Sequence, residues 1–308
     1  MNKRFEQFDI LKGIGIILVM FGHAIPNGYV HDWIYGFHMP LFFFCSGFFY
    51  KDKLLIEATV KDIKGLLIPW LTFSQILVLC SCILKVYSNG SGPIFQPLNE
   101  NCWILYYTIW FLIALFIVRL IYRIITKSHR ILFVNLLIGG GYLTATIFKE
   151  TDIDIPFFID SSMAMLIFYH LGKCFNKYKI YEKRLSVGIS ILILLLYSFF
   201  IAYVQPSVNI KDNIFPYYLP LLSIAPIISL YQISCRIKSK CLMLCGASSL
   251  TIMGLHHPVF DVAMFPIVNR LPLPHACQVV LMVGTTLLMV LLIDKILNKY
   301  TPFLLGKF

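Results

Sequence analysis

The sequence predicts an all-α integral membrane protein with about ten transmembrane helices. Three observations lead to this fold class. Of the 308 residues, 58% are hydrophobic and only 13% are charged, and the mean hydropathy is +0.78. The apolar residues form runs that approach the roughly 20 residues needed to cross a hydrocarbon core. The 26 lysines and arginines gather in short clusters between these runs. Soluble globular domains do not combine these properties.

Ten apolar runs are the candidate spans. In chain order they are 11–25, 33–49, 66–86, 103–124, 131–148, 157–174, 185–204, 215–233, 242–265 and 277–297. No loop between them is long enough for a folded soluble domain, so we expect a single domain over residues 1–308. The basic start followed by apolar residues also resembles a secretory signal. Because Lys12 lies inside the run and no cleavage site follows, we expect a retained first helix.

The distribution of basic residues predicts the orientation. With these ten spans, 22 lysines and arginines fall on the side of the N-terminus and four on the other side. Cytoplasmic loops retain Lys and Arg, so both termini are predicted to lie in the cytoplasm. A net charge of +11 also occurs in nucleic-acid-binding proteins, but these concentrate cations on a solvated face. We therefore expect the lipid bilayer as a partner and no nucleic acid.

Ionisable side chains in the first span are functional candidates, because such groups are costly in lipid. Asp9 and Lys12 lie near its inner end and His23 at its outer end. Lys12 and His23 are eleven residues apart, about 16 Å along a helix and close to a whole number of turns, so they share a face. Two structural readings stay open. Lys12 can be an anchor that reaches the membrane surface, and His23 can be an interfacial residue packed against Pro26.

Histidines followed by proline mark two further spans. His38 lies two residues before Pro40, which predicts a locally broken helix that lines a cavity, with a purely structural histidine as the alternative. His256 and His257 precede Pro258, and because adjacent helical residues point about 100° apart, we expect only one of them to face a site. Metal ligation is not predicted, since no carboxylate or third histidine lies at a suitable spacing. The nine scattered cysteines form no CxxC pair and indicate neither a disulfide framework nor a metal site.

Two pairs of polar residues lie at the ends of spans. Lys61 and Lys64 are three residues apart and are expected to share one face of a short helix, where they can contact lipid headgroups or clamp a phosphate. Glu100 and Trp103 begin the fourth span at its outer end, where a carboxylate and an indole can bind a sugar. An aromatic belt at the membrane interface explains Trp103 equally well.

These segments resemble the integral-membrane acyltransferase-3 proteins, which include fucose 4-O-acetylase-like enzymes and transfer acyl groups to carbohydrates of the bacterial cell surface. The resemblance covers most of the chain. It rests on FDILKGIGI at 8–16 with the later GHA at 22–24, FHMPLFF at 37–43 with SG at 46–47, the basic pair before LIP at 67–69, IWFL at 109–112 and HHP at 256–258. Relatives often have Arg where this chain has Lys61 and Lys64. Lysine retains the charge but loses the bidentate phosphate geometry.

The resemblance implies a multi-pass O-acyltransferase of the bacterial cytoplasmic membrane. Such an enzyme moves an acyl group, most often acetyl, from cytoplasmic acyl-CoA to a hydroxyl of a cell-surface or lipid-linked carbohydrate. Acetyl-CoA or another acyl-CoA is then a co-substrate, and we expect no permanently bound cofactor. His23 is expected to be the general base, with His38 or one of the late histidines orienting it or stabilising an oxyanion.

The remaining candidates divide between donor and acceptor. Lys12, Lys61 and Lys64 are expected to hold the phosphates of CoA, with Asp9 positioning Lys12. The acceptor is expected to meet Glu100, Trp103, His256 and His257.

Two other functions stay open from the sequence. A transporter or flippase of a lipid-linked sugar or small metabolite can use the same intramembrane His and Lys residues as a polar pathway, although no internal repeat is visible. An acyltransferase can also act on an amino acid, an antibiotic or a lipid. The acyl group, the acceptor hydroxyl and the oligomeric state are not specified by the sequence.

Overall fold

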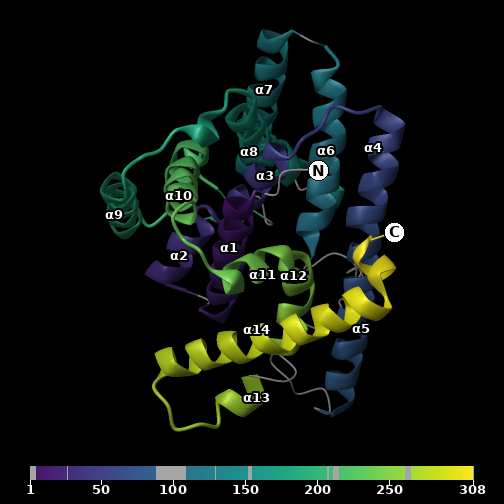
Figure 1. The fold of residues 1–308 in the computed structure, drawn as a ribbon, viewed down its shortest axis with the longest axis vertical. Coiled ribbons are helices and arrows are strands. Elements are labelled where there is room, and N and C mark those ends of the chain that lie inside the picture. Colours follow the sequence, from purple (N-terminus) through teal and green to yellow (C-terminus); the bar gives the residue numbers. More distant parts are fainter. Residues whose placement is uncertain are drawn as a thin grey trace. The chain divides into compact units, whose positions relative to one another are not determined.

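The computed structural model describes residues 5–25, 27–87, 109–128, 130–151, 155–206, 208–210, 215–260 and 265–307. Every regular element in these ranges is a helix, which confirms the all-α class (Figure 1). Among these described helices, five are long and apolar enough to cross a membrane. They are Glu6–Ala24, Leu55–Cys80, Ile131–Phe148, Val187–Val204 and His275–Tyr300. The total of ten spans and the cytoplasmic position of both termini stay predictions.

The chain divides into two compact units, described here one at a time. Unit 1 comprises residues 1–59 and 114–247, and unit 2 comprises residues 60–113 and 248–308. The helices wholly within unit 1 are α1 Glu6–Ala24, α2 Tyr29–Tyr35, α3 His38–Phe48, α7 Ile131–Glu150, η2 Pro156–Phe158, α8 Ile159–Lys177, η3 Ile180–Glu182, α9 Val187–Val204, α10 Leu219–Ser234 and α11 Lys240–Ala247. Those within unit 2 are η1 Ile63–Leu67, α5 Ile68–Tyr87, α12 Ser249–Pro258, α13 Phe265–Val268, α14 His275–Tyr300 and η5 Pro302–Leu305. The division falls inside α4 Leu55–Asp62 and α6 Trp110–Thr126. The expectation of one domain over 1–308 stays a prediction.

Reciprocal glycine contacts bring the helices of unit 1 close together. A Cβ atom on Gly13 of α1 would overlap the Leu242 carbonyl of α11, and one on Gly246 of α11 would overlap the Asp9 carbonyl of α1. The α3–α8 pair repeats this arrangement, because a Cβ atom on Gly172 would overlap the Phe44 carbonyl. Small residues that let backbones approach are typical of helix packing in membranes. These contacts fix α1, which carries Asp9, Lys12 and His23.

Aromatic side chains fill the core of unit 1. Phe8 of α1 stacks on Phe48 of α3, with ring centroids 3.9 Å apart, and lies 5.2 Å from the ring of Tyr231 in α10. Phe175 of α8 meets the same Tyr231 ring edge-on at 5.1 Å. All four side chains are buried. Offset and edge-to-face aromatic pairs add roughly 0.5–1.5 kcal/mol each beyond their buried area.

The span predicted at 33–49 is broken in the structure, as the sequence of His38 and Pro40 indicated. Helix α2 ends at Tyr35 and α3 begins at His38. Pro40 has no N–H to donate to the carbonyl four residues earlier, which belongs to Gly36, and its ring would collide with that carbonyl in a continuous helix. The Gly36 carbonyl instead accepts a hydrogen bond from the Ser223 hydroxyl of α10 at 2.6 Å. This bond satisfies the carbonyl that the break exposes.

The span predicted at 242–265 is also not one helix. Residues 240–247 form α11 in unit 1, whereas 249–258 form α12 in unit 2. Within unit 2, the Ser248 hydroxyl donates to Asp294 Oδ2 of α14 at 2.7 Å, and the Thr251 hydroxyl donates to the other oxygen of the same carboxylate. Figure 1 shows α12 beside α14. The two hydroxyls thus tie the first turn of α12 to a buried carboxylate, and the chain turns at this point.

Candidate active site

Helix α1 carries three of the predicted site residues on one continuous element. Asp9 Oδ1 lies 3.0 Å from Lys12 Nζ, so these side chains form an ion pair one turn apart. Both are mostly buried, with 16% and 25% of the respective side chains exposed. Since α1 is unbroken from Glu6 to Ala24, Lys12 and His23 lie on one helix with about 16 Å of rise between them. The N-terminal part of α1 therefore carries a cation held by a carboxylate, and the C-terminal end of α1 carries an imidazole.

The C-terminal end of α1 meets α2 through Tyr35. The Tyr35 hydroxyl lies 3.4 Å from His23 Nδ1. The same ring packs against His38, at 4.6 Å between centroids, and stacks on His31 at 3.8 Å. His31 Nδ1 in turn lies 3.0 Å from Asp32 Oδ1. Tyr35 thus stands between the two histidines that the sequence singled out, and it orders this cluster of unit 1.

His38 has a defined tautomer. Its Nδ1 lies 3.1 Å from the Ile34 carbonyl oxygen. Because a carbonyl can only accept, Nδ1 carries the hydrogen, and in the neutral ring Nε2 holds the lone pair. His38 is buried, at 4% exposure, directly after the helix break at 36–37. The break therefore places an imidazole acceptor deep in unit 1.

Three members of this cluster were missed by the sequence reasoning. Tyr35, His31 and Asp32 were not singled out, although a signal was present. His31 and Tyr35 are four residues apart in α2, so helical spacing places these two as neighbours. Aromatic residues are too common in this chain, at 15%, for that spacing to be noticed without the helix break.

In unit 2, Lys61 and Lys64 lie on either side of a change in helix type. Lys61 ends α4, whereas Lys64 lies in the π-helical turn η1 that leads into α5. Both side chains are exposed. A π turn is wider than an α turn. A spacing of three residues therefore does not by itself place Lys61 and Lys64 on one helix face, as it would in an α-helix. The backbone of this turn is fixed by Gly306, which approaches the Lys64 carbonyl so closely that a Cβ atom would overlap it.

The late histidines lie at the end of α12 in unit 2. His256 is buried at 1% exposure, and its Nδ1 lies 2.9 Å from the Ile252 carbonyl and 3.0 Å from the Met253 carbonyl. Nδ1 therefore donates and the neutral ring presents Nε2 as acceptor. The His257 ring is 4.7 Å from that of His256 and is less buried. As expected for adjacent helical residues, the two histidines lie in different surroundings.

Two predicted site residues, Glu100 and Trp103, lie outside the described residues. Their role in acceptor binding stays a prediction.

Comparison with known proteins decides the family. A family model described as an acyltransferase domain matches residues 5–294, which run through both units. The chain belongs to this acyltransferase-3 family. The predicted family is thereby confirmed.

One curated relative of this acyltransferase is the nodulation protein NolL of Mesorhizobium japonicum. The two sequences are 28% identical over 146 residues, which cover 42% of this chain and 38% of NolL. The chain therefore spans much less than two thirds of the length of NolL. No solved structure matches the acyltransferase significantly.

Proposed function

We propose that this acyltransferase is an O-acyltransferase of the bacterial cytoplasmic membrane that moves an acetyl group from cytoplasmic acetyl-CoA to a hydroxyl of a cell-surface or lipid-linked carbohydrate. The observation that carries the proposal is the α1 face, which holds the Asp9–Lys12 pair at one end and His23 against Tyr35 at the other. In this arrangement the protein has about ten transmembrane helices with both termini in the cytoplasm.

The base in this mechanism is His23. When His23 Nδ1 donates to the Tyr35 oxygen, the lone pair lies on Nε2, and an imidazole is suited to proton transfer near neutral pH. Nε2 takes the proton of the acceptor hydroxyl as its oxygen attacks the thioester carbonyl. The tetrahedral intermediate collapses, the C–S bond breaks, and the CoA thiolate leaves and is protonated. His38 orients the cluster through Tyr35.

The donor in this mechanism is held by cations. Lys12, Lys61 and Lys64 bind the phosphates of CoA, and Asp9 fixes the direction in which Lys12 points. The acyl-pantetheine arm then extends along α1, because the rise from Lys12 to His23 is of the same order as its length. The acceptor sugar meets Glu100, Trp103 and the late histidine pair.

The test is transfer of radiolabelled acetyl from acetyl-CoA to membrane glycans in inverted vesicles. Wild type is compared with His23→Ala and with a matched control, His275→Ala, which removes an exposed histidine at the start of α14. We expect label with the wild type and the control, and at least about a hundredfold less with His23→Ala, since a general base contributes roughly 10²–10⁴-fold. Equal label in all three would remove His23 as the base.

A further inference from the structure

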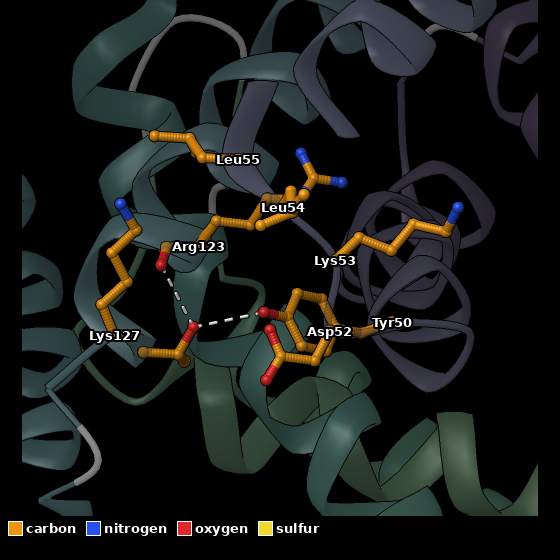
Figure 2. A pocket seen from close by; sticks show the side chains of 8 residues that line it. Tyr50, Asp52, Lys53, Leu54, Leu55, Arg123 and Lys127 are labelled. Carbon is orange, nitrogen blue, oxygen red and sulfur yellow. Dashed lines mark hydrogen bonds between the residues drawn. The ribbon is translucent and has the colours of Figure 1, made fainter. Parts of the chain in front are cut away.

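Unit 1 contains a pocket that the proposed mechanism does not use. Its volume is about 510 Å³, and it lies where the chain leaves α3 and where α6 ends. Its lining includes three basic side chains, Lys53, Arg123 and Lys127, and one carboxylate, Asp52. Figure 2 shows Lys127 and Lys53 at opposite sides of the view, with Tyr50 and Asp52 between them. The sequence places all three basic residues in segments assigned to the cytoplasmic side.

The basic residues on α6 make this pocket electropositive. Arg123 and Lys127 are four residues apart, so they project from one side of the helix end. Like charges at this spacing repel each other, although the helix C-terminus favours cations. Lys53 forms an ion pair with Glu57 at 2.6 Å. A phosphate in the pocket would meet positive charge from both residues.

Hydroxyl groups of Tyr50 and Thr126 line the pocket, and a further cation packs over the Tyr50 ring. The Tyr50 hydroxyl lies 3.2 Å from Thr126 Oγ1, and the Thr126 hydroxyl also lies 2.8 Å from the Tyr122 carbonyl, as donor (Figure 2 shows the Tyr50 contact). Lys173 of α8 lies 4.8 Å above the Tyr50 ring and 5.2 Å from that of Tyr122. The hydroxyl hydrogens are used in these bonds, so the phosphate-binding groups of the pocket are its arginine and lysine side chains.

The rim of the pocket is apolar and exposed. Leu54 lines the pocket with 78% of its surface exposed, and Ile56 nearby is 80% exposed. Large apolar side chains exposed beside a basic pocket are typical of a surface that meets both the headgroups and the chains of lipids. A soluble anion gains nothing from these residues, whereas a phospholipid covers them with its acyl chains.

We propose that this pocket binds a phosphate group, and that the apolar rim selects the headgroup of an anionic phospholipid as its source. Arg123 and Lys127 hold the phosphate, and the acyl chains lie over Leu54 and Ile56. Basic pockets between transmembrane helices on the cytoplasmic side bind such headgroups in other proteins. The phosphate could also come from the CoA donor, and this second source rests on the proposed function.

The experiment titrates the purified full chain with dioctanoyl phosphatidylglycerol or dioctanoyl phosphatidylcholine and follows bound lipid by native mass spectrometry. Wild type is compared with Arg123→Gln/Lys127→Gln and with Lys183→Gln, a control that removes an exposed lysine of unit 1 outside the pocket. A single Lys127→Gln variant is included because this side chain is exposed and its loss does not disturb packing. A parallel arm measures binding of radiolabelled CoA by equilibrium dialysis.

We expect phosphatidylglycerol to bind roughly 30-fold more weakly to the double variant and about fivefold more weakly to Lys127→Gln, with the control and CoA binding unchanged. A loss of CoA binding with phosphatidylglycerol unchanged would support the phosphate site and give the donor as its source. The proposal would be overturned if the double variant bound phosphatidylglycerol and CoA as the wild type does. It would also be overturned if the variant lost affinity for phosphatidylglycerol and phosphatidylcholine equally. The lipid arm requires no acyl transfer, so it stands or falls separately from the proposed function.

Discussion

The close approach of α1 and α11 predicts that Gly246→Ala destabilises the acyltransferase. A Cβ atom at this position would overlap the Asp9 carbonyl oxygen and approach the Gly13 amide nitrogen, both backbone atoms that no rotamer change can move. Gly140 of α7 is the matched control, because nothing lies within 4 Å of a Cβ atom built there. Both substitutions gain the same helix propensity, up to about 1 kcal/mol. The difference between the two variants therefore isolates the cost of the overlap.

That cost follows from overpacking. Inserting a methyl group into a well-packed interior typically costs about 1–3 kcal/mol. At roughly 2–4 °C per kcal/mol, Gly246→Ala should unfold about 2–12 °C below Gly140→Ala. Thermal unfolding in detergent can be followed with a thiol-reactive fluorophore, because Cys45 and Cys245 are buried and react only on unfolding. Replacing the exposed Cys241 and Cys277 with Ser lowers the background.

The reasoning is refuted if Gly246→Ala unfolds at or above the temperature of Gly140→Ala. That result would mean that α1 and α11 do not approach closely at Asp9. A lower unfolding temperature should also be accompanied by weaker CoA binding, because the displaced helix carries the Asp9–Lys12 pair.

Three further predictions concern single hydrogen-bonding groups. Tyr35→Phe keeps the ring packing but removes the hydroxyl beside His23, so acyl transfer should slow about tenfold with an unchanged KM for acyl-CoA in steady-state assays; an unchanged rate would argue against a positioning role. Asp294→Asn leaves one acceptor oxygen for two hydroxyl donors, so the free energy of unfolding, followed by thermal unfolding, should fall by about 1–3 kcal/mol. Wild-type stability would contradict a stabilising role for the hydrogen bonds between α12 and α14. Ser223→Ala removes the donor to the Gly36 carbonyl and should lower the free energy of unfolding by about 1–3 kcal/mol in the same assay; wild-type stability would show that this bond does not support the break between α2 and α3.

Local chemistry made the helices and one break predictable from the sequence. Long apolar runs gave α7, α9 and α14 to within three residues of their observed ends, because a segment in lipid must satisfy its backbone internally, whereas α1 begins at Glu6, five residues before the predicted run. Pro40 indicated the break before α3, since its ring excludes a continuous helix through Gly36. These features depend on residues close together in the chain.

Features that depend on distant residues were not predictable in this way. Tyr35 gains its place beside His23 only because the break turns α2 against α1. Arg119 lies in α6, where its Nη2 donates to Ser46 Oγ of α3 at 2.8 Å, a contact between residues 73 positions apart in the chain. The π turn at Lys64 and the separation of α11 from α12 likewise follow from tertiary contacts, with η5 and with Asp294, that no local pattern encodes.

The central claim is that the protein couples CoA release to acylation of an acceptor. The most direct measurement uses the purified protein in liposomes, supplied with labelled acetyl-CoA on one side and a glycan-bearing lipid in the bilayer, and counts labelled product and free CoA thiol together. The account predicts that the two rise in a one-to-one ratio and that both depend on His23. Movement of the glycan lipid across the bilayer without acetyl-CoA, and with no thiol released, would contradict it and indicate transport.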